Sequence, residues 1–182
     1  LKDAFKGERL FIMGTGPSLN LLGGPEVEAL SKEVTMGVNL LYRWSGLSFK
    51  PNFWATSETD VIKMCAPPLE TWDIPKFCAA QTDMNDGTFF THPGWTWLYV
   101  HPKSRVMNGH FNGLGDTLEW VGMGGSPMIN VGLQLGCWMG FQEIYMIGAD
   151  NSEDGYCYDS TIQRPADVVH VALRSEQASC RV

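Results

Sequence analysis

The stretch RLFIMGTGPSLN, residues 9–20, runs from an apolar segment directly into two glycines and a proline. Residues 9–14 are short, apolar and bounded by glycine, which is typical of a buried parallel strand. Glycine permits positive φ and close approach of the backbone, so Gly14 and Gly16 suit a special loop. On this pattern alone two interpretations stand: a structural turn, or a loop whose N–H groups hold a phosphate.

The loop matches neither of the two common phosphate-binding motifs. No Gly-Lys-Ser/Thr follows it, and Leu19 and Asn20 stand where a GxGxxG motif has its third glycine. The Ser18 hydroxyl adds a hydrogen-bond donor to the backbone N–H groups. If the loop binds a nucleotide, the predicted binding residues are Gly14, Thr15, Gly16, Pro17 and Ser18.

The rest of the chain alternates strand and helix patterns. Residues 25–30, with Pro25 at the first helical position, predict a short helix. A longer helix is expected over 128–139, between the Ser126-Pro127 cap and a stop at Gly140. Further strands are expected at 34–39, 52–56, 74–80, 97–100 and 141–148. This order predicts an α/β fold, Rossmann-like, with a mainly parallel sheet and helices on both faces.

Length and composition favour one globular domain. The chain has 182 residues, of which 44% are hydrophobic and 18% charged, enough for a full core. We find no linker or internal repeat and treat 1–182 as a single nucleotide-binding domain. The irregular stretch at about 82–123, rich in Gly, Asn, Pro and aromatics, is a candidate lid.

Net charge limits the ligands that the protein is expected to bind, and cysteine content indicates the redox compartment in which it works. The net charge of −7 argues against nucleic-acid binding, which needs a basic face, but not against a small anionic ligand. Five scattered cysteines, with no CxxC pair, fit reduced thiols in a cytoplasm better than a disulfide framework. No transmembrane segment or signal peptide is evident, so we expect a cytoplasmic protein.

Polar residues follow three of the predicted strands. Asn39 ends the second strand, Asp60 follows the third and Asp150 follows the last. In open α/β sheets ligands bind beyond the carboxyl ends of strands, so Asn39 and Asp150 are candidate nucleotide-binding residues. Asp60 and Asp150 are also candidate metal ligands. The alternatives are a turn asparagine and solvated loop carboxylates.

Three residues near the end of the sequence have side chains suited to group transfer. The phenolic hydroxyls of Tyr156 and Tyr158 could donate to a leaving phosphate. His170 could act as a general base near neutral pH. The alternatives are tyrosines that only pack and a structural histidine.

The order of these motifs resembles two families. Residues 11–19 resemble the first motif of bacterial sialyltransferases with a variant GT-A fold, in which an apolar strand ends in Gly-Asn-Gly-Pro-Ser-Leu. Residues 38–42 are similar to their second strand, which ends in an asparagine followed by aromatics. Residues 139–150 are similar to their Leu-Gly-Tyr-Lys-x-Ile-Tyr-Leu-x-Gly-x-Asp segment, and two tyrosines and a histidine follow. The 6-hydroxymethylpterin diphosphokinase-like family shares the Gly-x-Gly-Pro-Ser-Leu loop and the helix–strand–Asp unit.

The sialyltransferase resemblance implies a variant GT-A fold and transfer of a sugar from a CMP-type donor to an acceptor hydroxyl, on a glycan or a small molecule. No metal is obligatory in that family. The loop and Asn39 would hold the nucleotide, Tyr156 and Tyr158 would stabilise the leaving phosphate, and His170 would deprotonate the acceptor. Sialic acid and a different sugar are equally open as the transferred group.

Two alternatives from other functional classes stay open. The diphosphokinase-like resemblance implies ATP, with magnesium on Asp60 and Asp150, and pyrophosphoryl transfer to a pterin-like alcohol. The other alternative is a nucleotide-binding domain without catalysis. The sequence leaves the oligomeric state open, a homo-oligomer included.

Overall fold

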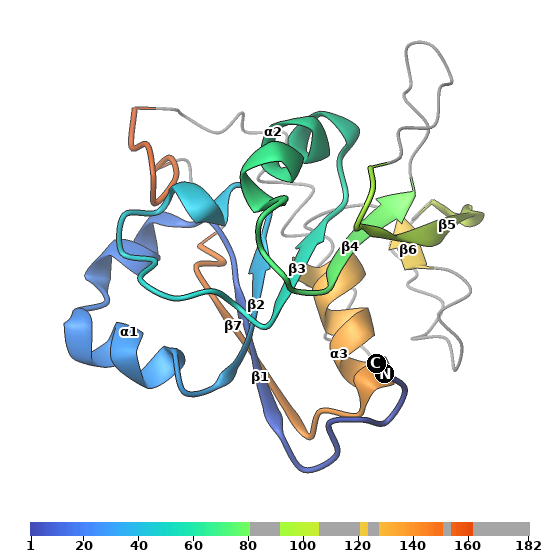
Figure 1. The fold of residues 1–182 in the computed structure, drawn as a ribbon, viewed down its shortest axis with the longest axis horizontal. Helices are drawn as coiled ribbons and strands as arrows, with labels where there is room; N and C mark the ends of the chain where they lie inside the picture. The colour runs from blue at the N-terminus through green and yellow to red at the C-terminus, as the bar shows by residue number, and fades with distance from the viewer. Residues whose placement is uncertain (81–91, 106–120, 124–127, 151–153, 162–182) are drawn as a thin grey trace.

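A seven-stranded, all-parallel sheet forms the centre of the protein (Figure 1). The computed structural model describes residues 1–80, 92–105, 121–123, 128–150 and 154–161. The strands are β1 (Arg9–Met13), β2 (Val34–Val38), β3 (Phe53–Thr56), β4 (Lys76–Ala80), β5 (Thr96–Arg105), β6 (Val121–Met123) and β7 (Glu143–Ile147). Their order across the sheet is β6-β5-β4-β3-β2-β1-β7, and every neighbouring pair is parallel.

Helices cover both faces of this sheet. The connections from β1 to β4 contain η1 (Pro17–Leu21), α1 (Gly24–Leu30), η2 (Leu41–Arg43) and α2 (Thr59–Leu69). The connection into β7 contains a π-type turn, η3 (Met128–Leu133), continued by α3 (Gln134–Met139), which ends at the left-handed Gly140. α3 lies across the sheet from α1 and α2 (Figure 1). Parallel crossovers are right-handed, and the chain steps across the sheet in the opposite sense to reach β7, so the helix before β7 lies on the opposite face.

The first hydrophobic cluster lies between the sheet and α3. Alternate strand residues such as Leu10 and Ile12 are fully buried against Val131, Leu135 and Met139. Successive side chains of a strand point to opposite faces, so one continuous apolar run supplies both cores. This cluster fixes the position of β7 next to β1.

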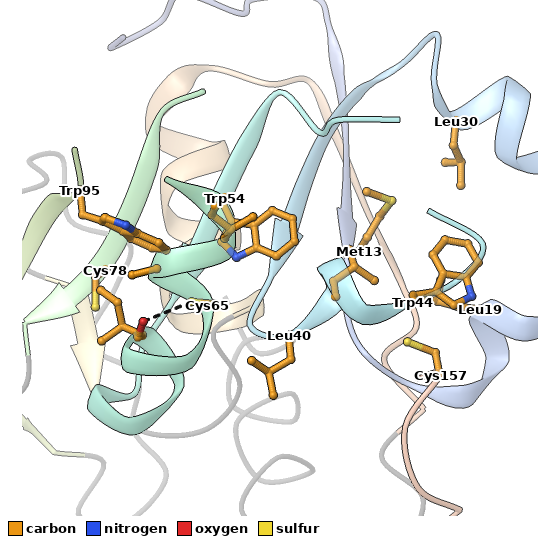
Figure 2. Close-up of a cluster of buried hydrophobic side chains, with 14 of the residues drawn as sticks. Met13, Leu19, Leu30, Leu40, Trp44, Trp54, Cys65, Cys78, Trp95 and Cys157 are labelled. Carbon is orange, nitrogen blue, oxygen red and sulfur yellow. Dashed lines mark hydrogen bonds between the residues drawn. The ribbon is translucent and has the colours of Figure 1, made fainter. Parts of the chain in front are cut away.

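The second hydrophobic cluster lies on the opposite face and is rich in aromatic and sulfur-containing side chains. Figure 2 shows Met13, Leu19 and Trp44 beside Cys157, and Trp54 and Trp95 beside the thiols of α2 and β4. Trp54 is fully buried. This cluster therefore joins the loop after β1, the turn after β2 and the segment around Cys157 into one packed unit.

The predicted fold class is confirmed, with differences in individual elements. The α/β architecture, the parallel sheet and the helices on both faces agree with expectation. β5 continues to Arg105, beyond the expected end at residue 100, and β6 and α2 are absent from the expected elements. Pro67 and Pro68 stand in the last turn of α2, where the helix ends soon afterwards at Glu70. Within the described part of the chain, no helix is long and apolar enough to cross a membrane.

Two buried thiols give the protein an expected loss of stability at alkaline pH. Burial raises the pKa of both Cys65 and Cys78 from 9.0 to about 12. Above pH 9 the unfolded chain releases these protons and the folded chain keeps them, so the free energy of unfolding falls as pH rises. We expect the two thiols to account for a fall of about 3 kcal/mol between pH 8 and pH 10.

Urea unfolding at the two pH values, with tryptophan fluorescence as the probe, measures this fall. The matched control is the Cys65→Ala/Cys78→Ala double variant. Its stability should be lower at pH 8 but should decline less on going to pH 10. Equal declines for the two proteins would show that the thiols do not carry the effect.

Candidate functional site

The carboxyl ends of the parallel strands meet at one edge of the sheet, and β1 lies there between β2 and β7. The chain leaves β1 toward β2 and returns on the other side at β7, so the strand order reverses at β1. Ligands of open α/β sheets bind outside the carboxyl ends of the strands at such a reversal. The loop 14–18 stands at this place, and it is where we build the site.

Hydrogen bonds to the segment after β7 hold the loop. The N–H groups of Gly14 and Gly16 donate to the carbonyls of Ile147 and Gly148, both at 2.8 Å. These bonds extend the β1–β7 pairing beyond the two strands. The loop is therefore held in place by its hydrogen bonds to the end of β7.

Steric fit explains why glycine stands at both positions. A Cβ on Gly14 would lie 2.4 Å from the carbonyl oxygen of Gly148. A Cβ on Gly16 would lie 2.6 Å from the same oxygen and 2.0 Å from Oδ2 of Asp150. Close backbone approach is thus the reason for both glycines, as expected for a special loop, but the partner is the protein itself.

Asp150 is the polar partner of this loop. Its Oδ2 accepts a hydrogen bond from the Ser18 N–H at 2.8 Å, in the first turn of η1. The N–H groups of Gly14, Gly16 and Ser18 are thus bonded to protein acceptors. Pro17 has no backbone N–H. Thr15 carries the loop N–H that has no acceptor among the described residues. The Thr15 N–H is therefore the backbone donor that this loop could offer to a ligand.

Asn39 has the turn conformation that was one of the two interpretations of this residue from the sequence. It adopts a left-handed conformation with φ of 51°, as turn asparagines do, and its N–H donates to Ala55. Its Oδ1 accepts a hydrogen bond from the Thr56 hydroxyl at 2.9 Å, and its carbonyl accepts one from Trp54 Nε1. The half-buried side chain is therefore fixed at the ends of β2 and β3. Its Nδ2 donates to no acceptor within the described ranges.

The segment 154–161 docks onto the loop after β1. The Cys157 N–H donates to the Thr15 carbonyl at 2.9 Å, and the Cys157 carbonyl accepts from Asn20 Nδ2 at 3.1 Å. The Oδ1 of Asn20 accepts in turn from Trp44 Nε1 at 3.0 Å. Figure 1 shows this segment in red-orange beside the turns that follow β1 and β2. Tyr156 and Tyr158, which flank Cys157, are thereby brought to the candidate site.

The two tyrosines form an ordered aromatic stack. Their rings are nearly parallel, 7° apart in angle, with centroids 5.2 Å apart. The guanidinium of Arg43 lies 5.9 Å from the Tyr158 ring and 5.7 Å from the Tyr42 ring. Arg43 is absent from the residues expected from the sequence. The sequence offered one signal for it, because Arg43 directly follows Tyr42, the aromatic residue at the end of the second-strand motif.

Asp60 lies in the first turn of α2. It is exposed and forms an ion pair with Lys63 at 3.7 Å. Partial burial and the nearby Asp60 charge raise the pKa of Glu58, the residue that precedes this helix. In the part of the chain that the structure describes, no three His, Cys, Asp or Glu side chains are grouped as metal ligands.

Two predicted features lie outside the described residues. His170, the predicted general base, is one of them. Most of the candidate lid at 82–123 is the other, although β5 and β6 fall within that range.

Comparison with known proteins supports the fold. No family model and no curated protein matches the chain. Among solved structures, the chain is similar to the MAf glycosyltransferase from Magnetospirillum magneticum AMB-1, with a TM-score of 0.51 and 15% sequence identity. The match covers 85% of this chain and 25% of that one, so this chain spans about a quarter of its neighbour's length. The fold is thus glycosyltransferase-like.

Proposed function

We propose that this domain binds a nucleotide sugar and transfers the sugar to an acceptor hydroxyl. One observation supports this most: Cys157 docks Tyr156 and Tyr158 onto the loop after β1, at the sheet edge where open α/β folds bind ligands. The glycosyltransferase-like fold and the sialyltransferase-like motif order agree with it. A CMP-type donor, and a glycan or small-molecule acceptor, follow from that motif order.

The proposed reaction is direct displacement at the anomeric carbon. The acceptor oxygen forms a bond to that carbon as its bond to the phosphate oxygen breaks, and the bonding electron pair stays on the phosphate. The acceptor proton passes to a general base, for which we propose His170. Negative charge grows on the departing phosphate, and Tyr156 and Tyr158 would stabilise it.

A ligand panel tests the proposal. Thermal melts would be recorded with CMP, CMP-sugars, UDP-sugars and ATP, each with magnesium and with EDTA. We expect CMP and its sugars to raise Tm in both buffers, because a ligand at 100 times its Kd adds about 2.7 kcal/mol of stability. A shift confined to ATP with magnesium would favour the pyrophosphokinase alternative, and no shift with any nucleotide would overturn the proposal.

Turnover separates an enzyme from a domain that only binds. Release of CMP from a CMP-sugar in the presence of acceptors is the readout. His170→Ala should abolish release and leave the CMP-induced Tm shift intact, and Glu58→Gln serves as the comparison at the sheet edge. If Glu58→Gln abolishes release and His170→Ala does not, the base is misassigned. Tight CMP binding without turnover by the unmodified protein favours the non-catalytic alternative.

A further inference from the structure

We propose that Arg43 binds the phosphate of the donor, and that Tyr158 acts as the aromatic platform that positions its guanidinium. This proposal rests on the proposed function, and it identifies Arg43 as the positively charged residue of the nucleotide-sugar site. Arg43 is exposed at the end of η2, and its guanidinium lies near two aromatic rings, 5.7 Å from the Tyr42 ring and 5.9 Å from the Tyr158 ring. Tyr156 stacks on Tyr158 with a centroid distance of 5.2 Å, so the platform consists of two stacked rings.

Hydrogen bonds orient the guanidinium. Arg43 Nε donates to the Tyr42 hydroxyl at 3.1 Å, and this hydroxyl donates to the Met64 carbonyl at 3.3 Å. In an α-helix the N–H of residue 68 would bond to that carbonyl, but Pro68 has no N–H. The Met64 carbonyl is therefore available to anchor Tyr42. Nε is thus engaged, while the two terminal nitrogens of Arg43 make no hydrogen bond to a described residue.

The charge of Arg43 is not neutralised by the described part of the protein. The ion pairs there join Lys6 to Asp3, Arg9 to Glu33, Lys32 to Glu28 and Lys63 to Asp60. Arg43 belongs to none of them. Cation–π contacts hold an arginine in place while leaving its terminal N–H groups for an oxyanion. A fixed cation without an anionic partner is well suited to bind phosphate.

A short hydrogen-bonded path joins Arg43 to the loop after β1. Trp44, the next residue, donates to Asn20, and Asn20 donates to Cys157. Cys157 donates to the Thr15 carbonyl. The phosphate-binding cation is thus part of the same packed unit as the loop, on the side of the sheet covered by α1 and α2.

The chemistry of the departing group explains why a cation is needed here. Breaking the sugar–phosphate bond adds a full negative charge to the phosphate, and Thr15 offers the loop N–H not already bonded within the described residues. A planar guanidinium donates two parallel bonds to phosphate oxygens, which a lysine cannot reproduce. The ring of Tyr158 would hold this fork in place, and its hydroxyl keeps the separate role toward the departing phosphate proposed above.

Calorimetry with CMP and cytidine tests whether Arg43 binds the phosphate. Arg43→Gln should weaken CMP binding by about 10- to 100-fold and leave cytidine binding within about 2-fold, because cytidine lacks the phosphate. Lys50→Gln is the matched control, since Lys50 is an exposed cation that also lies over an aromatic ring, Trp72. Equal losses for CMP and cytidine, or for Arg43→Gln and Lys50→Gln, would overturn the assignment of Arg43.

Two substitutions at Tyr158 separate ring from hydroxyl. Tyr158→Phe keeps the platform and removes only the hydroxyl, so it should weaken CMP binding less than Tyr158→Leu does. Tyr158→Leu removes the platform and should weaken CMP binding at least 5-fold, with Tm reported for both variants. If Tyr158→Phe weakens CMP binding as much as Tyr158→Leu, the hydroxyl is the contact and the platform role is wrong.

A third ligand distinguishes failure of this inference from failure of the proposed function. If the unmodified protein binds no nucleotide, the proposed function falls, and inorganic pyrophosphate then decides on Arg43. Pyrophosphate that raises the Tm of the unmodified protein but not of Arg43→Gln would keep the oxyanion site. If pyrophosphate raises the Tm of both proteins equally, or of neither, the proposal that Arg43 binds an oxyanion is wrong.

Discussion

Gly16→Ala is expected to lower the free energy of unfolding by about 3 kcal/mol or more. The new Cβ would lie 2.6 Å from the Gly148 carbonyl oxygen, which is backbone and cannot rotate away. It would also lie 2.0 Å from Oδ2 of Asp150, the acceptor for the Ser18 N–H. Relieving both contacts separates the loop from β7 and lengthens the hydrogen bonds that join them.

Gly24→Ala is the matched control in the same β1–β2 connection. No atom lies within 4 Å of a Cβ at Gly24, and this residue begins α1. Alanine there should change stability by between zero and about 1 kcal/mol, in the stabilising direction. Denaturant unfolding of the two variants measures the contrast. Gly16→Ala with the stability of the unmodified protein would mean that the loop is not packed as described.

Trp54→Ala is expected to lower the free energy of unfolding by about 3–5 kcal/mol. The Trp54 side chain is fully buried in the second cluster and meets the Trp72 ring edge-to-face at 5.5 Å. Its ring fills the space over Gly37, where a Cβ would come within 2.5 Å. Alanine leaves a cavity at this point and also removes the hydrogen bond from Nε1 to the Asn39 carbonyl.

Trp54→Phe divides the effect between packing and hydrogen bonding. Phenylalanine keeps most of the ring and loses the donor, so we expect a loss of about 1–2 kcal/mol. Urea unfolding of the two variants gives the comparison. A loss for Trp54→Phe as large as for Trp54→Ala would assign the stabilisation to the Asn39 hydrogen bond and its effect on the β2–β3 ends.

The strands and the general position of the site were predictable from local patterns. Apolar runs bounded by turns marked β1, β2, β3, β4 and β7, and glycines after β1 marked a special loop. What sequence could not supply was the partner of those glycines, because Gly148 and Asp150 lie far along the chain. Without knowledge of these distant partners, the sequence does not distinguish a glycine required for backbone packing from a glycine required for phosphate binding.

Arg43 and α2 escaped prediction for different reasons. One surface arginine in a sequence is unremarkable, and its role depends on the Tyr158 ring, which only the fold brings near it. In α2, two consecutive prolines argue against a helix, yet they stand where the helix is about to end. Pro68 leaves the Met64 carbonyl without its helical N–H partner, and the Tyr42 hydroxyl donates to this carbonyl instead. The prolines that argue against a helix in the sequence therefore help to position Tyr42.

The pairing of β7 with β1 also has a consequence for the order of folding. The Ser18–Asp150 hydrogen bond joins residues 132 positions apart, and the docking of Cys157 on Thr15 spans a similar interval. During synthesis, β1 and β2 leave the ribosome long before β7, so the edge of β1 stays without its partner until nearly the whole described chain has emerged. Contacts of such long range form slowly. We therefore expect the loop after β1 to acquire its final shape late in folding, and a chain truncated before β7 to lack the hydrogen bonds that hold the site together.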